Sequence, residues 1–85
     1  LYMKIQVVLQ FGFPTLDFDI DPSTTLNDLK KKCEEERRFE DASDYFIAFM
    51  YPHGVLVNDL KLTLESLNVK EGDQLFYIYE SIASG

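Results

Sequence analysis

Two stretches near the start of the chain alternate between apolar and polar residues, and this period of two constrains the fold more than any other feature. Alternation runs through residues 3–11, is interrupted by a turn signal at residues 12–14, and resumes over residues 15–21. Such a period is typical of strands that bury one face. The pattern therefore predicts a β-hairpin with this buried set: Met3, Ile5, Val7, Leu9, Phe11, Leu16, Phe18 and Ile20.

One amphipathic helix is expected after the hairpin, over residues 26–37. Pro22 ends the second strand because proline cannot donate to a β-ladder. Thr25 is the expected N-cap, with Asp28 at the acidic position of a capping box. Residues spaced by three and four positions form the apolar stripe, and charged residues fill the other faces. The stripe consists of Leu26, Leu29 and Cys33.

Three more strands are expected after the helix, at residues 45–51, 55–57 and 74–79, with one helical turn at residues 64–67. The predicted order is β-β-α-β-β-β. It indicates an α+β fold in which one helix crosses one face of a mixed sheet.

Composition excludes several classes of function. The chain has 85 residues, enough for one domain, and its 8 basic and 15 acidic residues give a net charge of −7. Excess acid argues against nucleic acid or an anionic membrane as a partner. No apolar run approaches the ~20 residues that span a bilayer, so no membrane insertion is expected. A lone cysteine without a signal peptide indicates a cytoplasmic protein, which we expect to be monomeric.

The sequence does not offer a catalytic or metal-binding set. Cys33, the candidate nucleophile, lies on the apolar stripe of the helix, and His53 lies in a turn between Pro52 and Gly54. One cysteine and one histidine exclude a disulfide framework and the common zinc sites. We therefore expect no enzymatic activity, no metal and no cofactor.

An acidic row is expected on the outer face of the second strand: Asp17, Asp19 and Asp21. Alternate residues of an exposed strand do not converge, so no cleft is expected there. Such a row can protect an edge strand from unwanted pairing, or it can face a partner. Both interpretations stay open.

Three segments carry a resemblance to a known family. Residues 20–30 resemble the proline turn and helix start of ubiquitin and its relatives. Residues 63–69 resemble the Leu-x-x-x-x-Val turn of that family, and residues 70–75 resemble the entry to its last strand. The resemblance covers nearly the whole chain. It implies the β-grasp fold, with the first and last strands parallel at the centre of the sheet. The domain would span residues 1–80, and residues 81–85 would form a flexible tail or linker.

Two narrower resemblances point to different roles. Residues 44–49 and 68–77 are similar to the ubiquitin-like first subdomains of FERM proteins of the talin type. A chain of this length that ends in glycine is similar to the ubiquitin-fold modifiers, although Ser84-Gly85 stands where most conjugated relatives have Gly-Gly.

The third and last strands are apolar on both faces, which predicts an exposed apolar surface opposite the helix. Its expected members are Phe46, Ala48, Met50, Phe76 and Ile78. The resemblance places them on the surface by which ubiquitin meets its receptors. A shift of the third strand by one residue would instead expose Ile47, Phe49 and Tyr51. An external protein and a neighbouring domain of a longer chain are both possible occupants.

These observations predict a non-catalytic ubiquitin-like protein-interaction domain, part of a larger cytoplasmic scaffold or adaptor protein. The alternative is a free modifier that is conjugated to its targets through Gly85.

Overall fold

The computed structural model describes residues 1–9, 13–37, 45–51 and 55–81, and its elements follow the predicted order. They are β1 (Met3–Val8), β2 (Leu16–Ile20), α1 (Leu26–Arg37), β3 (Tyr45–Tyr51), β4 (Val55–Val57), the 3₁₀ helix η1 (Glu65–Leu67) and β5 (Gln74–Ser81). β5 runs two residues beyond its predicted end at Tyr79. Ser81, the first residue of the predicted tail, therefore belongs to β5, and residues 82–85 lie outside the described residues.

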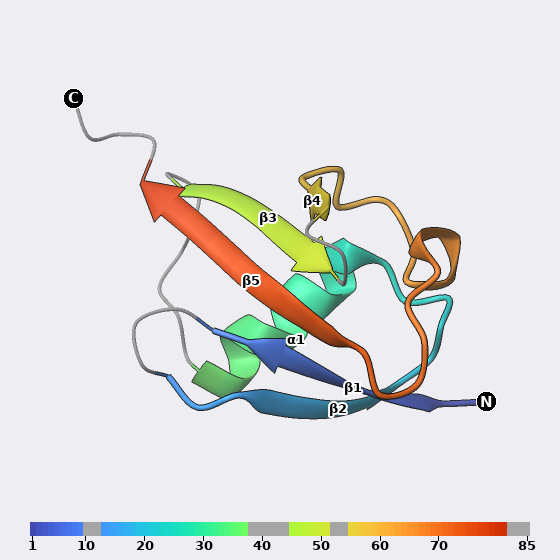
Figure 1. Ribbon diagram of the computed structural model, residues 1–85. Coiled ribbons are helices and arrows are strands. Elements are labelled where there is room, and N and C mark those ends of the chain that lie inside the picture. Colours follow the sequence, from blue (N-terminus) through green and yellow to red (C-terminus); the bar gives the residue numbers. More distant parts are fainter. Residues whose placement is uncertain (10–12, 38–44, 52–54, 82–85) are drawn as a thin grey trace.

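All five strands form one sheet in the order β2-β1-β5-β3-β4. β1 and β5 pair in parallel, and the other neighbours pair antiparallel. The α+β β-grasp prediction is therefore confirmed, including its central parallel pair. α1 lies across one face of the sheet (Figure 1). The opposite face, which we call the outer face, has no helix over it among the described residues.

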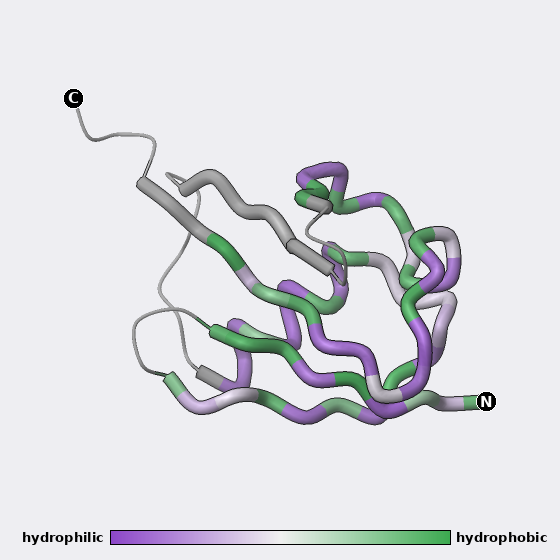
Figure 2. Tube along the Cα trace, in the orientation of Figure 1, coloured by the Kyte–Doolittle hydropathy of each residue, from purple (hydrophilic) through white to green (hydrophobic). Residues whose placement is uncertain are grey.

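The core lies between α1 and the sheet, and the alternation along the strands builds it (Figure 2). Val7 and Leu75, which are Cα partners on the two central strands, are both fully buried. The predicted helix stripe is buried with them: Leu26, Leu29 and Cys33. Phe18 differs from the prediction because it is only half-buried, although it packs against the core. It lies on β2, an edge strand with one neighbour, so less of the sheet surrounds it.

Hydrogen bonds join the start of α1 to the segment before η1. The Asp28 N–H donates to Thr25 Oγ1 at 3.1 Å, which confirms Thr25 as the N-cap. The N–H groups of Leu26 and Asn27 donate to the carbonyls of Leu62 and Leu60, at 2.9 and 2.8 Å. The first N–H groups of a helix have no partner within the helix. Here two of these N–H groups donate to carbonyl groups that lie more than thirty residues away in the sequence.

A tight turn before β5 fixes that strand against β1. Gly72 has a φ of +86°, a conformation that favours glycine. Its N–H donates to the Lys4 carbonyl at 2.7 Å, and the Gln6 N–H donates to the Asp73 carbonyl at 3.0 Å. These bonds set the register in which β5 meets β1.

Val7 and Val8 test which face of the sheet is the core. Val7→Ala should lower the free energy of unfolding by about 2–3 kcal/mol, because it leaves a cavity in the core. Val8→Ala should lower it by less than about 1 kcal/mol, because Val8 is only half-buried on the outer face. Urea denaturation of both variants measures the difference. Equal losses would show that the assignment of the two faces is wrong.

Candidate protein-interaction surface

A row of apolar residues crosses four strands on the outer face. The Cα register pairs Met50 of β3 with Phe76 of β5 and with Leu56 of β4, and it pairs Phe76 with Val8 of β1. Directly opposed residues of a sheet share a face. Phe76 is 39% exposed and Leu56 is 54% exposed, while Val8 is half-buried. Large apolar groups are therefore open to solvent along this row.

The next row of the same face pairs Ala48 with Ile78, and the one after it pairs Phe46 with Glu80. Ile78 is half-buried. The predicted register of β3 is therefore the observed one. In the alternative register Phe49 would be outside, yet its Cα partner Tyr77 is 1% exposed and lies in the core. The side chains of Phe46, Ala48 and Met50 lie outside the described residues.

We call the described apolar members of these two rows the apolar surface: Val8, Leu56, Phe76 and Ile78. Two of them are absent from the predicted set. The alternation in the sequence places Val8 on the outer face. Because Val8 is apolar at a position where its neighbours on that face are polar, it could have been predicted as a member of the apolar surface. Leu56 lies in a strand of three residues, too short for alternation to show which face it occupies.

A chain of side-chain hydrogen bonds borders the apolar surface on β1. Gln74 Nε2 donates to Gln6 Oε1 at 3.2 Å, and Gln6 Nε2 donates to Asp17 Oδ1 at 3.0 Å. The three residues belong to β5, β1 and β2, and their Cα register places them in one row. The outer face therefore changes from apolar to polar within one row of residues.

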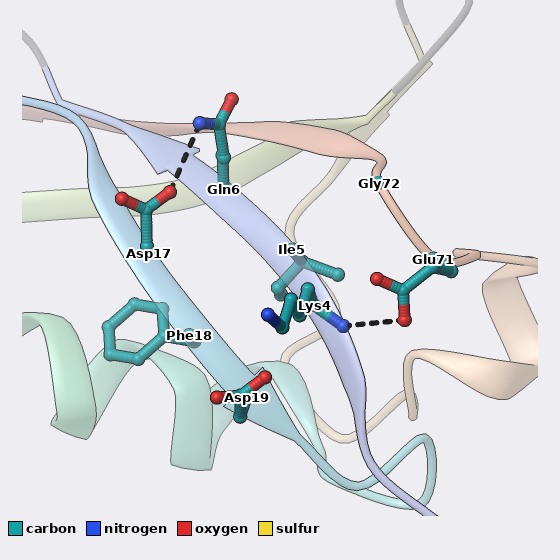
Figure 3. A pocket seen from close by; sticks show the side chains of 8 residues that line it. All are labelled: Lys4, Ile5, Gln6, Asp17, Phe18, Asp19, Glu71 and Gly72. Atoms are coloured by element: carbon teal, nitrogen blue, oxygen red, sulfur yellow. Dashed lines mark hydrogen bonds between the residues drawn. The ribbon is translucent and has the colours of Figure 1, made fainter.

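Next to this row lies an open depression of about 660 Å³, lined by polar side chains together with Ile5 and Phe18. Figure 3 shows these lining residues: Lys4, Ile5, Gln6, Asp17, Phe18, Asp19, Glu71 and Gly72. The Lys4 backbone N–H donates to Glu71 Oε1 at 3.0 Å, which holds this carboxylate at the rim. The depression combines three carboxylates with one ammonium group.

The expectation that the acidic row has no cleft is corrected for two of its members. Asp17 and Asp19 line the depression on one side of β1, and the turn before β5 places Glu71 and Gly72 on the other side. Asp21 does not take part. Its carboxylate accepts hydrogen bonds from the Ser23 N–H and hydroxyl, both at 2.8 Å, and these bonds lower the pKa of Asp21.

Cys33 is the one candidate nucleophile that the described residues contain, and it lies in the core with no exposed surface. Burial raises the pKa of its thiol from 9.0 to about 12, and Glu34 and Glu36 add to this shift. The thiolate that a nucleophile needs is therefore scarce at neutral pH. His53 and Gly85 lie outside the described residues.

Two other kinds of feature are absent from the part of the chain that the structure describes. It contains no group of three or more His, Cys, Asp or Glu side chains that could hold a metal ion. No helix within the described ranges is long and apolar enough to cross a membrane.

Comparisons with known proteins bear on the fold. Neither a scan against protein-family models nor a search of curated proteins found a match. Among solved structures, the chain is similar to the ubiquitin of Caldiarchaeum subterraneum, with 22% identity and a TM-score of 0.74 over 98% of this chain and 99% of that one.

Two other solved structures agree. A protein designed on the basis of ubiquitin has 24% identity and a TM-score of 0.73, covering 99% of this chain and 93% of that chain. The ubiquitin-like domain of an Arabidopsis thaliana protein has 15% identity and a TM-score of 0.76, covering 99% and 83%. The chain therefore has the ubiquitin-like β-grasp fold over nearly its whole length.

Proposed function

We propose that this chain is a non-catalytic protein-interaction domain that binds its partner through the apolar surface. One observation carries the proposal: an apolar row crosses four strands on the face that no described helix covers. The predicted positions Phe46, Ala48 and Met50 extend the surface along β3.

The energetics of burial support this proposal. Contiguous exposed apolar surface on a small protein commonly marks a contact with another protein. Covering about 300 Å² of such surface is worth roughly 7 kcal/mol at about 25 cal/mol per Å², before the costs of association. Removing these groups from water therefore favours binding, and further contacts around the apolar surface have to offset the rest of the cost of association.

The partner is either a separate protein or a neighbouring domain of a larger cytoplasmic scaffold, as in the FERM proteins that parts of the sequence resemble. In this arrangement the folded unit ends with β5 at Ser81, and residues 82–85 lead toward the next domain. In both cases the apolar surface is buried against another folded domain.

Acidic substitutions on the apolar surface test the proposal. Phe76→Asp and Ile78→Asp should each weaken partner binding by about 30-fold or more, because a carboxylate would have to be buried against an apolar partner. Partners are captured from lysates of the source cells with the wild-type chain. The most abundant one is then purified and titrated by calorimetry.

Asn27→Asp is the matched control, because it adds the same charge on α1, in the layer on the other side of the sheet. It should bind as the wild type does. Equal affinity of all four proteins would overturn the proposal. Circular dichroism melts establish that each variant is folded, and Phe76→Asp keeps the test decisive if Ile78→Asp unfolds.

Cys33 tests the non-catalytic part of the proposal. Below pH 9 the thiol is protonated in both the folded and the unfolded state; between pH 9 and about 12 only the unfolded state ionises, so stability falls as pH rises. Iodoacetamide should therefore label Cys33 at least about 100-fold more slowly in the folded chain than in urea. Mass spectrometry measures both rates. Rapid labelling of the folded chain at pH 7 would contradict an inert core thiol.

The second candidate function is that of a modifier joined to its targets through Gly85, and the likeness to a whole ubiquitin chain favours it. An immunoblot of the source cells separates the two roles. A scaffold domain predicts one band much larger than 9.9 kDa that Gly85→Ala does not change. A modifier predicts a small band and a ladder of conjugates that Gly85→Ala removes.

A further inference from the structure

We propose that the segment docked on the apolar surface is basic as well as apolar, with a Lys or Arg side chain over the depression beside Asp17, Asp19 and Glu71. This inference rests on the proposed function, since it names the chemistry of the partner at the same face. Two adjoining features of the outer face carry it: the apolar surface and the acid-lined depression.

The spacing allows one short segment to reach both features. Asp17 and Phe76 lie two strands apart and one row apart, on β2 and β5. With strands about 4.8 Å apart and alternate residues about 6.6 Å apart, their Cα atoms are separated by about 12 Å. An extended peptide covers this distance in about three or four residues. The partner should therefore carry its basic residue that far from an apolar anchor.

The charges of the depression favour a cation. Lys4 is the one basic residue among those that line it, against the carboxylates of Asp17, Asp19 and Glu71. Two of these three already accept hydrogen bonds, Asp17 from Gln6 and Glu71 from the Lys4 N–H. These bonds hold both carboxylates in place while leaving acceptor capacity for a guanidinium or ammonium group.

The chain as a whole adds to this preference. A net charge of −7 attracts basic partners during the encounter and disfavours acidic ones. A second copy of this chain is a poor occupant for the same reason, because it carries an equal negative charge. The hydrogen-bonded side chains of Gln74, Gln6 and Asp17 lie where the two features adjoin.

A random peptide library displayed on phage tests the inference, because it offers the chain segments of every charge and hydropathy. The wild-type chain is the bait, and the enriched peptides are synthesised and titrated by fluorescence anisotropy. We expect enriched sequences with Lys or Arg three or four residues from a large apolar residue. The double variant Asp17→Asn with Asp19→Asn should weaken their binding about five- to tenfold and reduce its salt dependence.

Glu35→Gln with Glu36→Gln is the matched control, because it removes two charges from exposed positions on α1. This control should change affinity less than twofold if the local carboxylates matter rather than net charge. Asn retains an oxygen that can accept the Gln6 hydrogen bond, so the test variant should keep the fold.

The outcomes separate this inference from the proposed function. Peptides that lose binding with Phe76→Asp but not with the double Asn variant would overturn the basic partner and leave the apolar surface as the docking site. Peptides that bind Phe76→Asp as well as the wild type, or a library with no enriched peptide, would overturn both. Equal losses with the α1 control would overturn the role of the depression.

Discussion

One helix of twelve residues has to cover a sheet of five strands, and the arrangement of the molecule follows from that limit. A helix of this length is about 18 Å long, so its single apolar stripe can bury one face of the sheet and no more. The strands accordingly place Ile5, Val7 and Leu75 on the helix side. Among the described residues, no helix packs on the outer face, so this face is available to a partner.

The outer face is polar on one half of the sheet and apolar on the other. On β1 and β2 the outward positions are mostly polar, as in sheets with one solvated face. On β4 and β5 the positions of Leu56 and Phe76 are apolar although no core needs them. We propose that these residues contact a second macromolecule, whose charge would complement the adjoining carboxylates.

The sequence predicts those parts of the fold whose periodicity is strong. A period of two identified β1 and β2, and the spacing of Leu26, Leu29 and Cys33 identified α1. Residues 45–51 are apolar throughout, so the sequence left two registers of this strand open, and its pairing with β5 decides between them. The depression could not be predicted from local pattern. It depends on Glu71 facing Asp17 across β1, although the two are more than fifty residues apart in sequence, and the pairing of β5 with β1 sets this arrangement.

The position of β5 in the sheet has a consequence for how the chain is made. β5 lies between β1 and β3, and it is the one described strand that joins the N-terminal hairpin to the β3–β4 pair. Gln6 meets Gln74 across 68 positions of sequence. Contacts of such long range slow folding, since most of the chain must be ordered before they form. During synthesis on the ribosome the two half-sheets therefore emerge unjoined, and their apolar faces stay open to chaperones until the last strand is complete.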